Sequence, residues 1–192
     1  MPRRILIVDG HPDPGGHFVH ALVAAYREAA VAAGHEVRAI EIATLDFPLL
    51  RSPDDFQKGR APAVILAAQQ DIAWADRLAI FYPLWLGSMP ALTKAFFEQC
   101  LRPGFAFGPV RGRGLPQQKL KGRSARVVVT MGMPTLFYKW YYRSHSLKSF
   151  ERNILHFCGI RPVRATIVGM VENKAAREKA LAAMRRFGAK AI

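Results

Sequence analysis

The chain has 192 residues, of which 51% are hydrophobic and 22% charged. This balance excludes a disordered protein and suits one domain, residues 1–192, with a full hydrophobic core. No apolar run reaches the roughly 18 residues of a membrane span, and the short apolar run near the start stops at Asp9. We therefore expect no membrane span, no signal peptide and a cytoplasmic location. The formal net charge of +14 is compatible with nucleic acid, a membrane surface or an anionic substrate as partner.

The basic residues are spread along the chain, with modest clusters at residues 111–126 and 177–190. The sequence has neither zinc-ligand spacing nor an RNA-binding strand signature. We interpret the charge as a solvated face that also steers phosphate-bearing ligands, and we expect no specific nucleic-acid partner and no metal site. The two cysteines, Cys100 and Cys158, lie far apart in apolar surroundings and are expected to be buried thiols.

The first half of the chain alternates strand and helix signals. A short apolar run, Arg3–Asp9, predicts a buried strand, and a Gly/Pro-rich turn follows it. Apolar residues then recur at helical spacing over residues 18–29, and Gly34 ends that helix. A second strand is expected at Glu36–Ile42, a loop over residues 44–62, and a helix over about residues 63–75.

The second half continues the alternation. The third strand, Arg77–Tyr82, runs into the loop PLWLGSMP, where Ser88 is expected to cap the next helix with Pro90 in its first turn. Residues 102–123 and 131–144 are expected to be irregular, on either side of a fourth strand at Arg126–Thr130. A helix over Leu147–Phe157, a fifth strand at Val163–Gly169 and a last helix capped by Asn173 complete the chain.

Five strands joined by helical crossovers predict an α/β fold: a doubly wound parallel sheet in the order 2-1-3-4-5, with helices on both faces. Ligands of such sheets bind beyond the carboxyl ends of the strands, where the strand order reverses. Three loops leave strand ends there and carry unusual residues: residues 11–18, 83–87 and 130–134. We expect these three loops to form one binding site.

Each loop on its own also has a plainer interpretation. The first runs through two glycines into a helix amino terminus, which suits a phosphate, but it is also an ordinary strand-to-helix turn. Trp85 in the second loop could be a wall for an aromatic ring, or a core or dimer-interface residue. In the third region, Gly132 permits close backbone approach, and Tyr138 and His145 could share proton transfer, or be one more aromatic residue and a surface histidine.

Three longer segments carry a resemblance to a known family. They are Trp74–Phe107 (WADRLAIFYPLWLGSMPALTKAFFEQCLRPGFAF), Leu155–Val163 (LHFCGIRPV) and the GHPDP start with Phe18 and residues 20–22. In these segments the chain resembles the flavodoxin-like NAD(P)H:quinone oxidoreductases, the group that includes DT-diaphorase and the bacterial drug-activity modulators. The resemblance covers most of the chain, from Ile5 to about Lys190.

The resemblance implies a flavin site and a role for each loop. His11 and the turn at His17 hold the phosphate arm, residues 83–87 line the isoalloxazine ring, and residues 130–133 contact its pyrimidine side. Tyr138 falls at the family's catalytic tyrosine, and His145 lies within one position of its catalytic histidine, where the pair stabilises charge on the reduced ring. The residues expected to bind the cofactor are His11, Gly16, His17, Phe18, Pro83, Leu84, Trp85, Leu86, Gly87, Thr130, Met131, Gly132, Met133 and Tyr138.

The resemblance also implies partners. Family members are homodimers with sites at the subunit interface, so Gln57 is expected to reach into the partner's site. The flavin is FAD or FMN, with a slight lean to FAD because Arg177 falls near a position that holds an adenine nucleotide end. The basic residues Arg111, Arg113 and Arg123 could attract the extra phosphate of NADPH.

The chain departs from the family pattern in two loops. The usual Ser, Phe, Asn run of the first loop reads His17-Phe18-Val19, so the polar contact of the asparagine is lost. The usual Thr-Thr-Gly-Gly of the third loop has Met131 and Met133 at two positions. Because many ring contacts come from the backbone, we expect flavin binding to survive both changes. We expect Met131 and Met133 to narrow the flavin pocket.

We expect a ping-pong reaction in which NAD(P)H delivers hydride to the flavin and leaves before a quinone, azo or nitro compound takes its place. The alternative from another class is a flavin-binding regulatory subunit of a potassium efflux transporter, because the same fold serves both. Nucleic-acid binding is a third reading of the basic charge.

Overall fold

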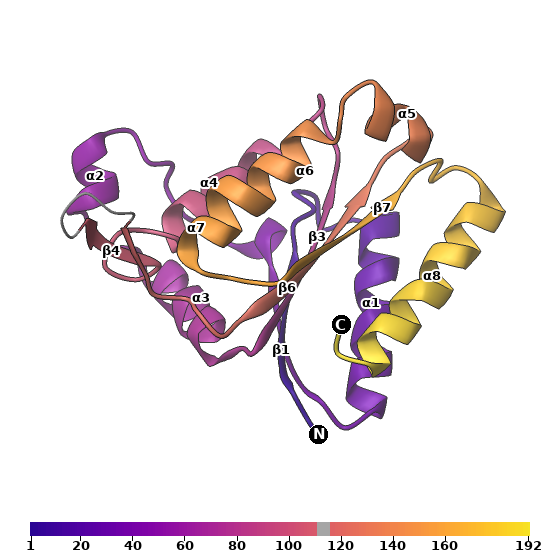
Figure 1. The fold of residues 1–192 in the computed structure, drawn as a ribbon, viewed down its shortest axis with the longest axis horizontal. Coiled ribbons are helices and arrows are strands. Elements are labelled where there is room, and N and C mark those ends of the chain that lie inside the picture. The colour runs from indigo at the N-terminus through magenta and orange to yellow at the C-terminus, as the bar shows by residue number, and fades with distance from the viewer. Residues whose placement is uncertain (111–115) are drawn as a thin grey trace.

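The computed structural model describes residues 1–110 and 116–192, and its centre is a five-stranded parallel sheet (Figure 1). The strands are β1 (Arg4–Asp9), β2 (Glu36–Glu41), β3 (Arg77–Pro83), β6 (Ser124–Thr130) and β7 (Val163–Val168). They lie in the order β2-β1-β3-β6-β7, and each neighbouring pair is parallel. Counted among the strands of this sheet, that is the order 2-1-3-4-5 expected from the sequence.

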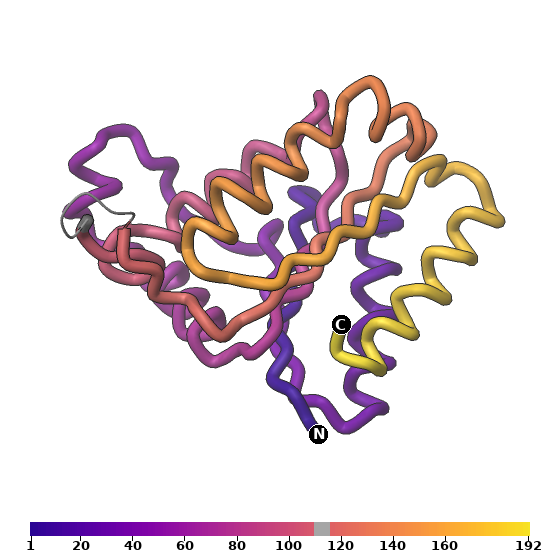
Figure 2. Tube along the Cα trace, viewed as in Figure 1, coloured from indigo at the N-terminus to yellow at the C-terminus, as the bar shows by residue number. Residues whose placement is uncertain are grey.

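Helices cover both faces of the sheet (Figure 1). On one face lie α1 (Phe18–Ala32) and α8 (Lys174–Ala189), which pack side by side although they come from opposite ends of the chain (Figure 2). On the other face lie α3 (Ala63–Trp74), α4 (Ala91–Cys100) and a continuous helix made of α6 (His145–Ser149), the π-helical segment η2 (Phe150–Leu155) and α7 (His156–Cys158). The two faces therefore bury two separate hydrophobic cores.

The sequence pattern explains this layering. The side chains of β1 from Ile5 to Val8 are all fully buried, and they alternate between the two cores because successive strand residues point to opposite faces. In α8, a side chain at Gly188 would place its Cβ 2.1 Å from the carbonyl oxygen of Tyr26 in α1. Glycine at this position therefore lets α1 and α8 pack closely.

Three short elements occur in segments that the sequence predicts to be irregular. They are α2 (Pro53–Gln57), an antiparallel arm of β4 (Phe107–Val110) and β5 (Pro116–Gln118), and α5 (Thr135–Trp140). In α2, Ser52 accepts a hydrogen bond from the Asp55 N–H at 3.1 Å, and Pro53 occupies the first helical position. The proline therefore begins a helix, because its missing N–H is not needed there.

Two predicted helix caps have different outcomes. Asn173 caps α8 as expected, because its side chain accepts a hydrogen bond from the Ala176 N–H at 3.0 Å. Ser88 does not cap α4, which begins at Ala91 with Pro90 at the N-cap. Ser88 instead forms two backbone hydrogen bonds with Trp85. Both cysteines are buried free thiols, as expected.

Within the parts of the chain that the structure covers, no helix is both long and apolar enough to cross a lipid bilayer.

Candidate flavin site

The loops that follow β1, β3 and β6 meet at the carboxyl edge of the sheet. The ring of His11, after β1, lies edge-on to the ring of Trp85, after β3, with 5.9 Å between the centroids. The Leu84 N–H donates to the carbonyl oxygen of Thr130 at the end of β6, at 2.8 Å. The structure therefore brings together the three loops that the sequence analysis singled out.

The first loop is fixed to its neighbours at Gly10. The Gly10 N–H donates to the Phe81 carbonyl at 2.7 Å, and the hydroxyl of Thr93 in α4 donates to the Gly10 carbonyl at 2.6 Å. A Cβ at residue 10 would lie 2.7 Å from the Phe81 oxygen. Only glycine permits this approach, which sets the direction in which the loop leaves the sheet.

Three histidines and two aspartates form a hydrogen-bonded cluster in this loop. The buried Asp9 accepts from the His11 N–H at 3.1 Å and bonds the His20 ring at 2.6 Å. Asp13 bonds the His17 ring at 2.7 Å, and the rings of His11 and His17 stack with 3.9 Å between centroids. These hydrogen bonds and the stacked rings hold the turn between β1 and α1 together.

The charges of the cluster shift its pKa values in both directions. Burial lowers the pKa of His11. Burial also acts to lower the pKa of His20, but the hydrogen bond and charge of Asp9 outweigh it, so the pKa of His20 is raised. The Gly15 N–H and the His17 ring lower the pKa of Asp13. Protonation near neutral pH therefore falls on His20 before His11.

The amino end of α1 is open to a ligand. His17 is its N-cap residue but makes no side-chain capping bond, and no acidic residue lies in the first turn. The N–H groups of Phe18 and Val19 have no hydrogen-bond partner among the described residues. A Cβ at Gly16 would meet no atom within 4 Å. Free N–H groups, the helix dipole and open space together suit a phosphate group.

The second loop is a two-residue hairpin that presents apolar side chains. Trp85 and Ser88 exchange backbone hydrogen bonds of 2.8 and 3.0 Å, and both central residues, Leu86 and Gly87, have positive φ angles of 47° and 80°. This is the pattern of a type I′ turn, which normally takes Asn-Gly. Leu86 is fully exposed and Trp85 is 49% exposed. A strained leucine left in solvent indicates a ligand-facing role.

The third loop continues the strand pairing of β6 and β7 before it turns. The Met131 N–H donates to the Val168 carbonyl at 2.9 Å, and the Met131 side chain is buried. The Met133 side chain is half-buried against the core beneath α4. Gly132 is exposed, and a Cβ there would meet no atom within 4 Å. The loop therefore offers open backbone at Gly132, with Met131 turned into the protein.

The two predicted catalytic residues do not contact each other. Tyr138 is fully buried in α5, and its hydroxyl lies 3.0 Å from the hydroxyl of Ser146, not from His145. His145 is exposed and lines a cavity with basic neighbours such as Arg143 and Lys148. Ser146 was missed, because the sequence indicated neither α5 nor the start of α6. It lines a cavity of about 510 Å³ together with Trp85 and Leu86.

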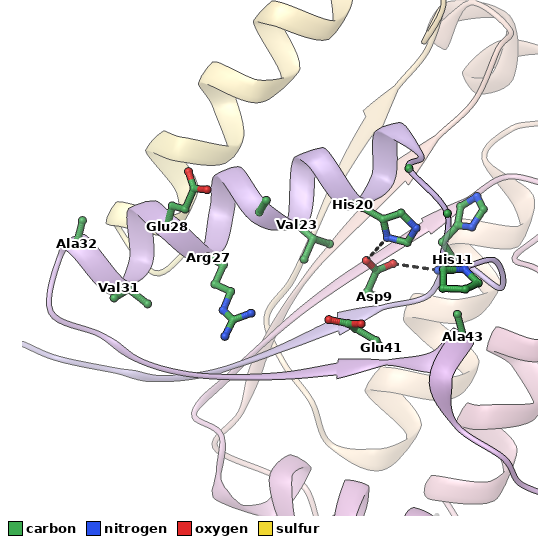
Figure 3. A pocket seen from close by; sticks show the side chains of 14 residues that line it. Asp9, His11, His20, Val23, Arg27, Glu28, Val31, Ala32, Glu41 and Ala43 are labelled. Atoms are coloured by element: carbon green, nitrogen blue, oxygen red, sulfur yellow. Dashed lines mark hydrogen bonds and ion pairs between the residues drawn. The ribbon is translucent and has the colours of Figure 1, made fainter.

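A cavity of about 960 Å³ adjoins the first loop but not the second (Figure 3). It runs from His11 and Gly16 along α1 toward Val31, with the side chains of Asp9, Arg27 and Glu41 facing it. The carboxylates of Asp9 and Glu41 disfavour a phosphate group next to them. The cavity beside Trp85 and the turn at residues 11–17 are therefore the parts of this edge with room for an aromatic ring and for a phosphate group.

The structure places three further residues that the sequence analysis singled out. The guanidinium of Arg177 lies over the ring of Phe18, 4.5 Å from its centroid, which places it beside the first loop. Gln57 is exposed at the end of α2. The side chain of Arg123, which the sequence analysis expected to attract the extra phosphate of NADPH, donates to the Ile72 and Ala73 carbonyls at the end of α3. Arg111 and Arg113 lie outside the described residues.

The residues at this edge fit a flavin. Gly16 and Gly132 leave open space at the two ends of the site, the uncapped start of α1 suits the phosphate, and Trp85 with Leu86 supplies an apolar wall. Residues 1–110 and 116–192 contain no group of three or more His, Cys, Asp or Glu side chains placed to hold a metal ion.

A parallel sheet of order 2-1-3-4-5, with loops that converge beyond its carboxyl edge, defines the flavodoxin-like class of α/β proteins. A family model described as "Flavodoxin-like fold" matches residues 3–190, and the chain belongs to this family.

Individual relatives carry the resemblance further. The chain is 25% identical over 177 residues to an uncharacterized NAD(P)H oxidoreductase of Haemophilus influenzae, covering 88% of this chain and 87% of the relative. A solved NAD(P)H:quinone oxidoreductase from Methanothermobacter marburgensis is 22% identical with a TM-score of 0.85, and all of both chains is covered. An FMN-dependent NADH-azoreductase from Bacillus anthracis, solved with FMN, is 13% identical with a TM-score of 0.76, covering 98% of this chain and 99% of that one. The resemblance stated from the sequence is confirmed.

Proposed function

We propose that the protein is a flavin-dependent NAD(P)H oxidoreductase that reduces quinones or related aromatic acceptors such as azo and nitro compounds. The observation that carries the proposal is the meeting of His11, Trp85 and Thr130 at one edge of the sheet, beside an uncapped helix amino terminus. The oxidoreductase names of the relatives agree with it. A bound flavin would supply hydride acceptance and donation in this site.

The chain's own residues would bind the phosphate, orient the flavin ring and hold a proton beside it. His17 and the free N–H groups at the start of α1 bind the phosphate, and Trp85 with Leu86 excludes water from one side of the ring. The hydroxyl pair of Tyr138 and Ser146 reaches from the core to the cavity beside Trp85, so it can hold a proton there. Donor and acceptor would use this one cavity in turn, which gives a ping-pong order.

Rapid mixing with NADPH tests the proposal. Flavin-loaded protein is expected to lose its visible absorbance within the turnover time and to regain it on addition of menadione. The Trp85→Ala variant is expected to bind flavin more weakly, whereas Trp74→Ala, changed in α3 away from the site, keeps wild-type flavin affinity. Protein that binds no flavin, or bound flavin that NADPH does not bleach, would overturn the proposal.

We propose FMN as the flavin, and the slight lean to FAD in the sequence analysis is not supported. The azoreductase relative is described as FMN-dependent. Arg177, the residue behind that lean, already stacks on Phe18. The mass of the ligand released from purified protein distinguishes the two cofactors.

The role of His17 can be separated from that of the ring-binding residues. We expect His17→Gln to weaken FMN binding about tenfold while leaving riboflavin binding unchanged, because riboflavin lacks the phosphate. Trp85→Ala serves as the contrast, because it should weaken both ligands equally. Equal loss of FMN and riboflavin affinity in His17→Gln would show that His17 does not contact the phosphate.

The regulatory alternative receives no support from the comparisons. Steady-state turnover with menadione separates it from the proposed enzyme. An oxidoreductase cycles rapidly alone, whereas a regulatory subunit binds flavin tightly and turns over slowly.

We also propose a homodimer. An apolar surface cavity of about 280 Å³ lies between α4, the η2–α7 helix and the arm. Its apolar lining consists of Phe56, Phe97, Leu101, Phe107, Ile154, Phe157 and Cys158. Gln57 follows Phe56 in α2, so a second copy seated here would bring Gln57 toward its own site. Light scattering of wild type and Phe56→Asp measures the oligomeric state, and a wild-type monomer would overturn this assembly.

A further inference from the structure

Four arginines lie in a row across the amino edge of the sheet, opposite the candidate flavin site. Arg77, Arg126 and Arg164 belong to β3, β6 and β7, and Arg3 immediately precedes β1. Arg126 and Arg164 are direct register partners, and Arg77 pairs with Ser124, two residues before Arg126. Residues two or four positions further along these strands lie in the core beneath α1 and α8. The side chains therefore share the α1–α8 face of the sheet.

These arginines line a cavity of about 280 Å³. Its charged lining residues are Arg3, Asp76, Arg77, Arg126, Arg161 and Arg164. The carboxylate of Asp76 is already bound by Arg4 at 2.7 Å. Among the described residues, no Asp or Glu carboxylate lies within 4.0 Å of any of the five lining arginines, and the end of the chain at Ile192 reaches only Arg126. The cavity therefore holds more positive charge than its acidic groups neutralise.

Arg126 is held in place by two hydrogen bonds and an aromatic ring. It is 6% exposed, its Nε donates to an oxygen of Ile192, the last residue of the sequence, at 2.7 Å, and its Nη1 donates to the Thr166 hydroxyl at 2.7 Å. The ring of Phe187 covers one face of the guanidinium at 3.8 Å. These are the only side-chain hydrogen bonds of Arg126 to described residues, so part of its five-donor fork remains available to the cavity. Arg77 is fixed similarly, by a 3.1 Å bond to the Ser124 hydroxyl.

The arrangement is unfavourable without a further anion. Like charges directly opposite on neighbouring strands repel, as Arg126 and Arg164 do here. Burial is the main cause that lowers the pKa of both Arg77 and Arg126, and the charge of Arg164 adds to it. Arginine stays protonated even so, and therefore the repulsion persists at every physiological pH.

We propose that this cavity binds a phosphate-bearing anion: inorganic phosphate, pyrophosphate, or the phosphate end of a nucleotide whose base remains outside. A guanidinium group can donate two parallel hydrogen bonds to a pair of phosphate oxygens. The cavity is lined by three such groups on neighbouring strands, those of Arg77, Arg126 and Arg164. The volume lies just below the roughly 300–1,000 Å³ of typical small-molecule sites, which limits the occupant to phosphate groups. The site is separate from the candidate flavin site, because it lies at the other end of the same strands.

Calorimetric titration of flavin-free protein with phosphate, pyrophosphate and ATP tests the proposal. Pyrophosphate is expected to bind the wild type, and the Arg77→Gln/Arg164→Gln variant is expected to lose about tenfold or more in affinity. The matched control is Arg51→Gln/Arg60→Gln, which removes the same charge from exposed positions in the segment around α2. Comparison of the three anions identifies the source of the phosphate.

Two further measurements keep the result independent of folding and of the flavin site. Pyrophosphate should raise the melting temperature of the wild type and the control, but not that of the Arg77/Arg164 variant. FMN should not compete with pyrophosphate. The proposal is overturned by absent pyrophosphate binding, by equal weakening in the control, by competition with FMN, or by binding of duplex DNA alone.

Discussion

At the scale of single residues, the candidate site contains several residue types that do not favour the stability of the fold. Leu86 has a positive φ of 47° and is fully exposed, although leucine rarely adopts this conformation. His17 stands at the N-cap of α1 without capping it. Gly16 and Gly132 border open space. Each residue is a poor choice for stability and a reasonable one for a ligand, and this contrast locates the site.

We expect Leu86→Asn to stabilise the flavin-free protein by about 1 kcal/mol, because Asn-Gly is the preferred pair of a type I′ turn. The same change should weaken quinone or flavin binding by removing an apolar contact. Urea denaturation and flavin titration measure the two effects. Leu136→Asn, at another exposed leucine without positive φ, is the control and should change stability by less than about 0.5 kcal/mol. A destabilised Leu86→Asn protein would contradict the role of backbone strain.

The His20 pair with Asp9 predicts a pH-dependent stability. Because the pKa of His20 is raised in the folded state, its contribution is fully present below the unfolded value of 6.5 and is lost as the pH rises through the folded pKa. Wild type should therefore exceed His20→Gln in unfolding free energy by more at about pH 5.5 than at about pH 8.5. Urea denaturation at both pH values measures this difference. The pKa of His11 is lowered instead, but His11 is present in both the wild type and His20→Gln, so its contribution cancels in the difference. A difference that grows with pH would refute the assignment.

At the scale of elements, the contact between α1 and α8 ties the two ends of the chain together. Gly188 is buried in α8 against the backbone of Tyr26 and Ala30 in α1. The helices can approach this closely only because residue 188 lacks a side chain. The contact also fixes α1, whose amino end carries the proposed phosphate site.

Gly188→Ala is expected to destabilise the protein by about 1–3 kcal/mol, although alanine favours helices by about 1 kcal/mol over glycine. The added Cβ would lie 2.1 Å from the Tyr26 carbonyl oxygen, so the two helices must move apart. Thermal or urea denaturation measures the loss. Gly132→Ala is the control, because its Cβ would meet open space in the flavin-free protein. Equal free energies of unfolding for Gly188→Ala and Gly132→Ala would mean that α1 and α8 can move apart at no measurable cost, which would contradict this prediction.

At the scale of the whole molecule, the two candidate binding sites lie at opposite edges of one sheet. The carboxyl edge carries the candidate flavin site, and the amino edge carries the arginine row. FMN that binds only the folded protein should stabilise it by about 2.7 kcal/mol at one hundred times its dissociation constant. Denaturation with increasing FMN measures this shift. A midpoint that does not respond to FMN would argue against a site formed by the folded loops.

Much of this architecture could be predicted from the sequence, because its signals are local. The apolar run at Ile5–Val8 and the helical spacing after Phe18 each reflect burial by a single element. The loop predicted over residues 44–62 contains α2, which begins at Pro53 because proline fits the first turn of a helix as well as a loop. The meeting of the three loops could be predicted because the strand ends of a parallel sheet share an edge.

The remainder depends on relations between distant residues. Ser146 bonds Tyr138 only because α5 turns the tyrosine inward, and no pattern in the sequence indicated α5. Arg123 looks like one more surface charge until its carbonyl partners at the end of α3 are known. Arg77 and Arg126 are 49 residues apart in the sequence and Arg126 and Arg164 are 38 apart, and strand register alone sets them side by side.

The pairing of α1 with α8 has a consequence for synthesis on the ribosome. The apolar face of α1 emerges early, but its covering helix is the last element to be made. At roughly 5–20 residues per second, that face waits on the order of ten seconds for its partner. The part of α1 that α8 covers therefore stays exposed in the nascent chain until residues 174–189 are made, and we expect a chaperone at the exit tunnel to bind it.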